Sequence, residues 1–410
     1  MVNSYKLGCT ERQYSHLNGR SRFQDYTMTG HIGLESEHEE YRQRVREFAE
    51  QEVAPVVDKY EGRGEFPLDL IDDLGDAGLY GVTIPDQYGG EGRDYRSFVV
   101  TIEELCRIWK IPAGVVSLSG SLIGHTLQKF GSERQREEWL TDIFTQNQVT
   151  AVSLTEPQAG SDANALETTA ERDGDEFVIN GHKVWTSHGE VADLIFVVAR
   201  TDNTGDHDDV SIIGVPNPKE RDGIEFVRDI PCMEGGAVVE NEVKYENLRV
   251  PIENLVGEEG RGFRYIMEAL DIGRLGVAAQ STGILRGCLD ESAKFADERE
   301  QFGEPIRENQ GISFKLADMK MDLEAARLLT YSAAAKLDAG ERVTQDAAIA
   351  KTFASDAAME GAIEAVQVLG SRGYSKDYPV ERFMREAKGA QIYEGTNEIN
   401  RTVVARHLYD

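Results

Sequence analysis

One carboxylate near the end of the sequence stands in a setting that could make it a base. Glu394 lies between Tyr393 and Gly395 in the segment 391–398, QIYEGTNE. An apolar setting would desolvate the carboxylate and raise its pKa, which would suit it to accept a proton. A carboxylate in the first turn of a helix is the simpler interpretation, and this segment taken alone favours it.

Two further segments concentrate groups that could hold a polar ligand. Residues 154–162, LTEPQAGSD, combine hydroxyls, small residues and backbone NH groups, although the same residue types also form ordinary turns. Arg299 opens the segment REQFG at the end of a long helical pattern. Its guanidinium could grip a pyrophosphate, or simply interact with the negative end of the helix dipole. Taken alone, neither segment distinguishes ligand binding from an ordinary turn or helix end.

The common catalytic and nucleotide-binding motifs are absent from the sequence. It contains no GxGxxG after a strand pattern, no GxxxxGK[ST], no GxSxG and no HExxH. This argues against a Rossmann dehydrogenase, a P-loop NTPase, an α/β-hydrolase and a zinc protease. The four cysteines, Cys9, Cys106, Cys232 and Cys288, lack the spacing of metal ligands, so no metal site is predicted. Reduced thiols and the lack of an apolar leader predict a cytoplasmic protein.

The chain of 410 residues is strongly acidic, with 73 acidic against 44 basic residues and a net charge of −29. Such a surface repels nucleic acid and anionic membranes, so nucleic acid is not an expected partner. No apolar run approaches the roughly 18 residues that span a bilayer, so membrane insertion is not expected either. The acidic residues are spread along the chain, and lysine is the minority among the basic residues. This favours a halophilic surface over an acidic tail.

Hydrophobic periodicity divides the chain into parts. Residues 1–34 lack periodicity and are predicted to form a disordered N-terminal extension, with Met28 as an alternative start. Helical patterns over 35–150 predict an N-terminal α-helical domain. Strand patterns over 151–257 predict a middle β domain. Long helical patterns over 258–410 predict a C-terminal helical bundle, which makes the chain a multidomain α+β protein.

One hairpin is predicted within the middle part. The segment 176–187, EFVINGHKVWTS, contains Asn180-Gly181 between two apolar runs. Asn-Gly in such a setting is the strongest short-range signal for a hairpin turn. We therefore expect two strands joined at these two residues.

Taken together, these segments resemble the acyl-CoA dehydrogenase family of flavoproteins. The resemblance covers about residues 35–410 and rests on four motifs: LTEPQAGSD, EREQFGEPIRENQ, QVLGSRGYSKDYPVERFMREAK and QIYEGTNEINR. It implies an N-terminal α-helical domain, a middle β domain and a C-terminal four-helix bundle. The implied reaction is FAD-dependent α,β-dehydrogenation of an acyl-CoA thioester to the trans-2-enoyl-CoA. Hydride passes to flavin N5, and the electrons then pass to an electron-transfer flavoprotein.

The resemblance also implies roles for single residues. Glu394 is the implied catalytic base, and its backbone NH polarises the thioester carbonyl. The implied substrate contacts are Ser161, Asp271 and Arg274. The implied FAD contacts within the subunit are Leu154, Thr155, Trp185 and Ser187, with the Ser187 hydroxyl near N5. Arg299, Gln301 and Phe302 hold the FAD of the neighbouring subunit, with Gln367 and Gly370 at its adenosine end and Thr396 and Glu398 near the diphosphate. The implied assembly is a homotetramer built as a dimer of dimers.

The sequence departs from the family pattern at a few positions. Ser371 replaces the second glycine of the common QxxGG, and residues 233–237 replace the usual Gly-x-Arg-x-Ser. Gly273 occupies the position to which one branch of the family moves the base, which leaves Glu394 alone in that role. The resemblance implies that residues 115–120, VVSLSG, line part of the acyl pocket. They carry no Lys or Arg to pair with a distal carboxylate, which favours a plain hydrocarbon acyl chain over a dicarboxylate. We expect a short or medium chain, straight or branched. The alternative is that residues 115–120 are packed core.

Two other functions stay open on the same fold. A flavin oxidase would pass electrons to oxygen instead of to a flavoprotein. A catalytically silent family member would serve as a scaffold.

Overall fold

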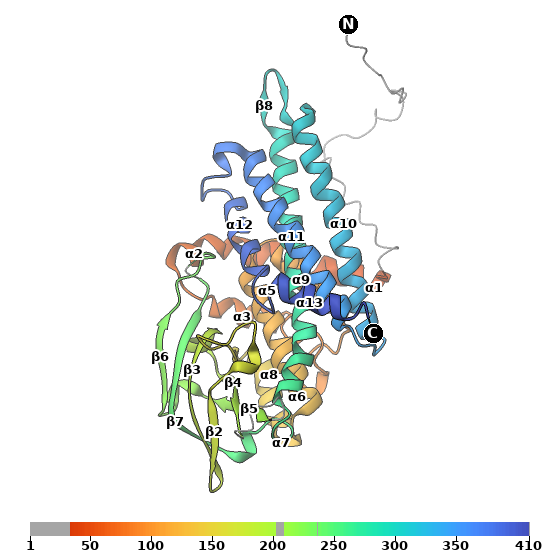
Figure 1. Ribbon diagram of the computed structural model, residues 1–410. Helices are drawn as coiled ribbons and strands as arrows, with labels where there is room; N and C mark the ends of the chain where they lie inside the picture. The colour runs from red at the N-terminus through yellow and green to blue at the C-terminus, as the bar shows by residue number, and fades with distance from the viewer. Residues whose placement is uncertain (1–32, 202–208, 236, 410) are drawn as a thin grey trace.

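The computed structural model describes residues 33–201, 209–235 and 237–409. The N-terminal and C-terminal parts of the chain are helical, and the β-sheet formed by its middle part lies to one side of these helices (Figure 1). Of the predicted N-terminal extension only Gly33 and Leu34 are described, and Leu34 is buried against the helices. The rest of that extension, including Met28 and Cys9, lies outside the described residues.

The N-terminal part consists of helices. Helix α4 is buried along nearly its whole length, because it lies between α1 on one side and α5, α9 and α10 on the other. The Asp94 side chain begins α4 by accepting a hydrogen bond from the Ser97 NH at 2.9 Å. The helices are α1 (Ser36–Phe48), α2 (Val57–Arg63), α3 (Leu68–Asp76), α4 (Tyr95–Cys106), α5 (Lys110–Leu118), α6 (His125–Phe130), α7 (Glu133–Gln135) and α8 (Thr141–Thr145).

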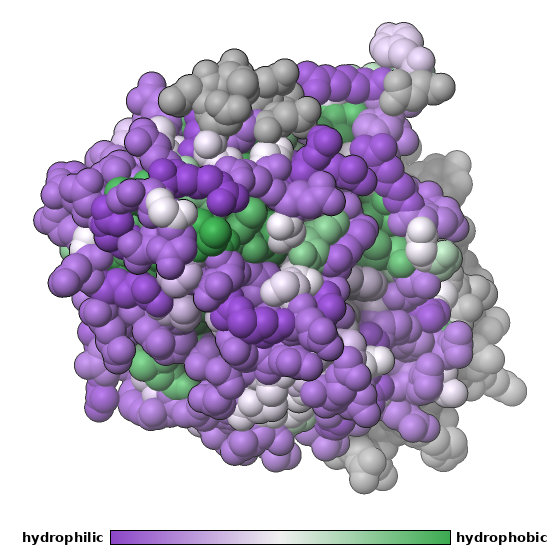
Figure 2. Space-filling view, turned by 90° about the horizontal axis from the view of Figure 1, so that it is seen from below, coloured by the Kyte–Doolittle hydropathy of each residue, from purple (hydrophilic) through white to green (hydrophobic). Residues whose placement is uncertain are grey.

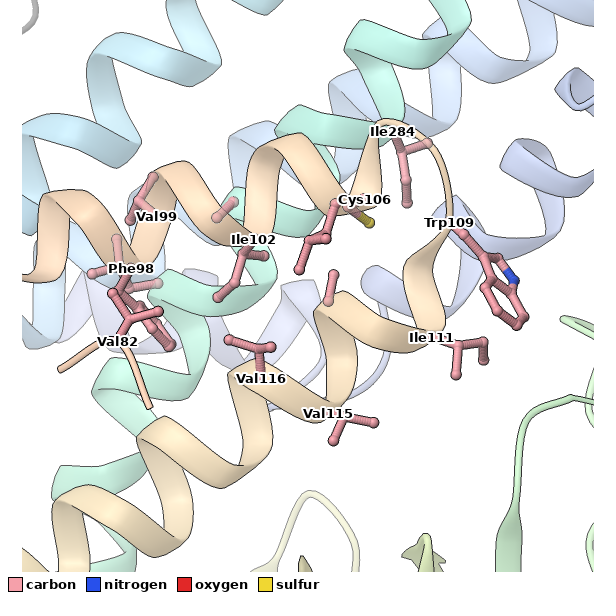
Figure 3. Close-up of a cluster of buried hydrophobic side chains, with 14 of the residues drawn as sticks. Val82, Phe98, Val99, Ile102, Cys106, Trp109, Ile111, Val115, Val116 and Ile284 are labelled. Atoms are coloured by element: carbon pink, nitrogen blue, oxygen red, sulfur yellow. The ribbon is translucent and has the colours of Figure 1, made fainter. Parts of the chain in front are cut away.

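Apolar side chains from α4, α5 and α9 meet in the core beneath these helices. Figure 3 shows Ile102 and Cys106 of α4 together with Val116 of α5 and Ile284 of α9 in this cluster. Val115 and Val116 are fully buried. The start of the segment 115–120 is therefore packed core.

The middle part forms one sheet of seven strands in the described residues, in the order β1-β4-β2-β3-β7-β6, with β5 paired to β4. β1 and β4 are parallel, whereas β3 and β7 are antiparallel. The six residues 194–199 of β4 are all buried, as their continuous apolar run predicts. The strands are β1 (Thr150–Ser153), β2 (Thr169–Asp173), β3 (Glu176–Ser187), β4 (Leu194–Arg200), β5 (Val210–Pro216), β6 (Ile224–Asp229) and β7 (Glu240–Pro251).

The predicted hairpin turn at Asn180-Gly181 is wrong. Both residues lie inside the single long strand β3, where the register with β7 shifts between Ile179 and Gly181. Glycine is needed at position 181 because Thr168 packs directly against the β3 backbone there: a Cβ on Gly181 would lie 2.2 Å from the Thr168 hydroxyl oxygen. The turn is made instead at Gly174, whose φ of 70° joins β2 to β3.

The C-terminal part is built on long helices. The 37-residue helix α9 is about 55 Å long and packs against α4, α10 and α11. Small residues bring α9 and α11 close together: a Cβ on Gly361 would lie 2.3 Å from Leu285 Cδ1. The elements are α9 (Gly262–Glu298), β8 (Glu300–Gln301), β9 (Glu304–Pro305), α10 (Gln310–Asp338), α11 (Thr344–Leu369), α12 (Val380–Ala390) and α13 (Asn397–Arg406).

The face of the molecule that Figure 2 shows is largely hydrophilic. Hydrophilic residues surround a narrower band of apolar ones on this face (Figure 2). Within the described part of the chain, no helix combines the length and apolar character that crossing a bilayer requires.

Candidate active site

Glu394 lies in a tight turn between α12 and α13. Glu394 and Gly395 both have positive φ, 56° and 84°. Thr396 then begins α13, because its hydroxyl accepts a hydrogen bond from the Ile399 NH at 3.3 Å. Glu394 therefore precedes the helix, and the interpretation as a carboxylate in the first turn of a helix is wrong.

A buried lysine from α11 holds this turn. The Lys351 ammonium donates to the Gly395 carbonyl at 2.9 Å and to Asn397 Oδ1 at 2.8 Å. Asn397 in turn donates to the Ser355 hydroxyl at 2.9 Å. Burial lowers the pKa of Lys351 to about 8, although the nearby Glu394 carboxylate opposes this shift. Lys351 fixes the backbone on which Glu394 is carried.

The Glu394 carboxylate faces the backbone of α9. A Cβ on Gly273 would lie 2.7 Å from Glu394 Oε2, so the absence of a side chain there makes room for the carboxylate. Oε2 is buried and has no hydrogen-bond partner among the described residues. Burial raises the pKa of Glu394 to about 7, and the charges of Arg274 and Lys351 oppose that rise. The carboxylate can therefore accept a proton near neutral pH.

Arg274 and Asp271 form an ion pair beneath the turn. Arg274 Nη1 donates to Asp271 Oδ1 at 2.6 Å, and its Nε lies 3.4 Å from the Glu394 carbonyl oxygen. The Thr344 hydroxyl donates to the other oxygen of Asp271 at 2.5 Å. Burial raises the pKa of Asp271, and the bond from Thr344 and the Arg274 charge act against this. Of the three candidate substrate contacts, Arg274 therefore contacts the Glu394 turn directly and Asp271 holds Arg274 in place.

The loop 154–162 is anchored by a buried ion pair. Lys183 of β3 donates to Glu156 Oε1 at 2.9 Å and to the Leu154 carbonyl at 2.8 Å. Glu156 also accepts from the Thr168 NH at 2.9 Å. Burial alone would raise the pKa of Glu156, but the Lys183 charge and the hydrogen bonds from Lys183, the Thr168 hydroxyl and the Glu167 NH lower it to about 2. The loop is thereby rigid at its base, while Ser161 at its far side is exposed.

Trp185 and Ser187 lie on β3 beside this loop. The Val184 NH donates to the Thr155 carbonyl at 2.9 Å, which holds Thr155 next to Trp185. The Trp185 side chain is 52% exposed, which is unusual for an aromatic residue of this size. The Ser187 hydroxyl donates to Glu240 Oε1 at 2.8 Å. The β domain thus offers an open aromatic side chain and a hydroxyl at the C-terminal end of β3.

Backbone strain marks several of the same residues. Among the described residues, positive φ occurs at seven non-glycine positions, and three of these are Asn, which tolerates it. The other four are Trp185, His188, Phe302 and Glu394. Such conformations cost of order 1 kcal/mol or more and gather at functional sites. Three of the four are residues that the sequence had assigned to cofactor binding or catalysis.

A second group of candidate residues lies far from Glu394. Arg299, Gln301 and Phe302 lie on or beside the β8–β9 hairpin at the tip of α9 (Figure 1), and Phe302 is fully exposed. Gln367 and Gly370 at the end of α11 are also exposed. They lie near the same tip, since the guanidinium of Arg372, two residues after Gly370, stands 5.5 Å from the centre of the Phe295 ring near the end of α9.

The helix geometry separates the two groups. From Arg274 to Arg299 the α9 axis rises about 37 Å. Thr396 and Glu398, in contrast, lie directly after Glu394, so the structure places them with the first group.

Sequence reasoning missed Lys351, Lys110 and Glu240. The signal for Lys351 was a lysine on the buried face of an alanine-rich helix, where a cation needs a partner. The Lys110 ammonium lies 4.6 Å from the centre of the Tyr393 ring and 2.5 Å from Glu234. For Lys110 and Glu240 the sequence carried no local signal.

Comparison with known proteins shows the family. Residues 35–147, 151–242 and 260–409 match the models of the acyl-CoA dehydrogenase N-terminal, middle and C-terminal domains. An acyl-CoA dehydrogenase of Bacillus subtilis is 40% identical over 90% of this chain and 96% of its own length. This chain belongs to the acyl-CoA dehydrogenase family of flavin-dependent oxidoreductases.

Solved structures agree with the family and with the fold. Butyryl-CoA dehydrogenase of Megasphaera elsdenii has a TM-score of 0.88 and 38% identity, and the match covers 92% of this chain and 99% of that one. A chain from a structure described as the electron transferring flavoprotein of Acidaminococcus fermentans has a TM-score of 0.89 and 40% identity, with the same coverage. The expected three-part fold is thereby confirmed.

Proposed function

We propose that this protein dehydrogenates a short-chain acyl-CoA to the trans-2-enoyl-CoA, with Glu394 as the base, FAD as the hydride acceptor and an electron-transfer flavoprotein as the electron acceptor. The observation that carries this proposal is the Glu394 carboxylate, whose buried oxygen lacks a hydrogen-bond partner among the described residues and faces Gly273. A carboxylate that has no structural partner and is held on a strained backbone is suited to act as a catalytic base on a bound substrate.

The proposed chemistry follows from the groups around Glu394. The ionised carboxylate takes the proton from the α-carbon of the thioester. The Glu394 backbone NH polarises the thioester carbonyl, which stabilises the negative charge that develops when the proton leaves. Arg274 and Lys351 fix the Glu394 turn through its backbone and that of Gly395, so the carboxylate keeps its position.

The C-terminal end of β3 fits a flavin. The backbone of Leu154 and Thr155 is hydrogen-bonded to Lys183 and Val184 of β3, and the open Trp185 side chain and the Ser187 hydroxyl follow on the same strand. An exposed aromatic residue on a strained backbone has little structural reason to stay open to solvent, but it suits stacking against a planar ring system. When bound, FAD accepts the β-hydrogen as hydride.

The distant group of candidate residues supports an oligomer. Arg299, Phe302 and Gln367 lie at the far end of α9 and α11, about 37 Å along the helix from Arg274. A single dinucleotide is too short to contact both groups within one chain. We therefore assign these exposed residues to the FAD of a neighbouring subunit, in a tetramer built as a dimer of dimers.

Short acyl chains fit the packing around Gly273 best. Val115 and Val116 fill the space beneath α5 as core residues, and the Ser117 hydroxyl faces α9, where a Cβ on Gly276 would lie only 2.2 Å from it. Little room is left for a long chain between these helices. The solved butyryl-CoA dehydrogenase at 38% identity supports the same preference.

The variant Glu394→Gln tests the catalytic assignment. It should purify with its yellow FAD spectrum, because the amide keeps the size of the side chain, yet lose turnover with butyryl-CoA by about a thousandfold. Turnover close to that of the wild type would contradict the role of Glu394. Purification without flavin would instead favour the silent scaffold.

A substrate panel tests the acyl chain and the electron acceptor. Butyryl-, isobutyryl-, octanoyl-, palmitoyl- and glutaryl-CoA should be compared by bleaching of the flavin, and we expect butyryl-CoA to be the best. A clear preference for glutaryl-CoA or palmitoyl-CoA would contradict the proposal. Rapid reoxidation of the product-bound enzyme by air would identify an oxidase.

A further inference from the structure

Ser187 has a carboxylate partner on the neighbouring strand. Ser187 ends β3 and Glu240 begins β7, and the two residues are paired directly across the antiparallel ladder. The Ser187 hydroxyl donates to Glu240 Oε1 at 2.8 Å. The proton of this hydroxyl is therefore engaged by Glu240 and is not available to another acceptor.

Charged and titratable groups surround Glu240 from several elements. Lys110 at the start of α5 lowers its pKa, and Glu234, in the segment where the sequence departs from the family pattern, raises it. Cys232 faces Glu240 from the same segment, and the Glu240 carboxylate helps to raise the pKa of that thiol. Burial is the largest influence on Glu240 and brings its pKa to about 7.

The same lysine connects Glu240 to the proposed base. Lys110 is ion-paired with Glu234 at 2.5 Å and stands over the ring of Tyr393, which directly precedes Glu394. The Tyr393 hydroxyl donates to Gln280 of α9 at 2.8 Å. Glu240 and Ser187 therefore belong to a polar cluster that borders the proposed active site.

We propose that Glu240 is a positioning residue that sets the direction of the Ser187 hydroxyl toward the flavin. Ionised Glu240 accepts the Ser187 proton, so Ser187 can offer only oxygen lone pairs to the flavin. Protonated Glu240 donates its own proton to the Ser187 oxygen, which frees the Ser187 proton for the acceptor N5 of the oxidised flavin. The inference rests on the proposed function, because it requires a flavin beside Ser187.

The consequence is a dependence on pH with a defined sign. Below about pH 7 Glu240 is protonated, and Ser187 donates toward N5, which withdraws electron density and favours hydride acceptance. Above this pH Ser187 turns back to Glu240 and the assistance is lost. Glu394 acts in the opposite direction because it must be ionised, so turnover should pass through a maximum near neutral pH.

The test is a pH titration of the oxidised, substrate-free holoenzyme, followed by the visible absorption of FAD. The titrated proteins all carry Glu394→Gln, because Glu394 also titrates near pH 7; protein with Glu394 intact is used to measure reduction by butyryl-CoA. In this background we expect the flavin band to shift with an inflection near pH 7 when Glu240 is present and to show no inflection in Glu240→Gln, whose amide cannot ionise. Glu242→Gln is the matched control: Glu242 lies two residues along β7, pairs with Arg228 and should leave the inflection unchanged. Ser187→Ala keeps Glu240 but removes the hydroxyl that transmits its state, so it should also abolish the inflection.

The outcomes separate the inference from the proposed function. An inflection retained in Glu240→Gln would overturn the role of Glu240. An inflection retained in full in Ser187→Ala would show that Glu240 acts on the flavin through its charge alone, which also overturns the inference. In both cases flavin binding and reduction by butyryl-CoA would leave the proposed function standing. A protein that binds no flavin would contradict both.

Discussion

Replacing the proposed base should stabilise the protein at alkaline pH. The folded protein raises the pKa of Glu394 from 4.5 to about 7. Between these two values the folded state keeps a proton that the unfolded state releases, so wild-type stability falls as the pH rises through this window. The Gln side chain does not ionise in this range, so Glu394→Gln should keep the free energy of unfolding that the wild type loses.

The size of the effect follows from the pKa shift. Each unit corresponds to about 1.36 kcal/mol, so a buried carboxylate would lose about 3 kcal/mol of unfolding free energy across the window. Glu394 is partly exposed, and solvent screening reduces the expected gain of the variant to about 2 kcal/mol at pH 8. Well below pH 4.5, both states of the wild type are protonated, so the gain should be near zero.

Urea unfolding at pH 5 and pH 8, with saturating FAD and equal salt, measures the difference. The control is Glu341→Gln, which changes an exposed carboxylate before α11 and should show no such dependence on pH. If Glu394→Gln is no more stable than the wild type at pH 8, or gains equally at both pH values, then the desolvation argument is wrong. In that case Glu394 has a favourable partner in the folded protein.

Three further predictions concern other parts of the molecule. Gly273→Ala places a Cβ 2.7 Å from Glu394 Oε2 and should lower turnover at least about tenfold. Gly311→Ala, with open space around it on α10, should leave turnover unchanged. Equal turnover in the two variants would refute the close approach of the Glu394 carboxylate to Gly273. Arg299→Ala should weaken FAD retention and shift the assembly to smaller species in size-exclusion chromatography; full flavin at native size would exclude the cross-subunit role. The net charge of −29 should make the wild type lose its folded structure, followed by circular dichroism, as KCl falls below molar concentrations, and an unchanged melting temperature in dilute buffer would contradict a halophilic surface.

Local patterns in the sequence were sufficient for the architecture. Helical periodicity, apolar runs such as 194–199 and the positions of the motifs depend on neighbouring residues, so they predicted the order of helices and strands that the structure shows. The Asn180-Gly181 signal failed although it is equally local. Its conformation was decided by β7 and by the close approach of Thr168, which lie outside the segment that carries the signal.

The environment of each functional group was decided by the tertiary structure. The motif around Glu394 was recognisable from the sequence, but the space that its carboxylate occupies is left by Gly273, 121 positions earlier on α9. Lys351, Lys110 and Glu240 were not recognisable as part of the site, because their roles depend on contacts across α11, α5 and β7. Residue type and short spacing are properties of the chain itself. Desolvation, ion pairing and the direction of a hydroxyl arise only when distant segments pack together and exclude water.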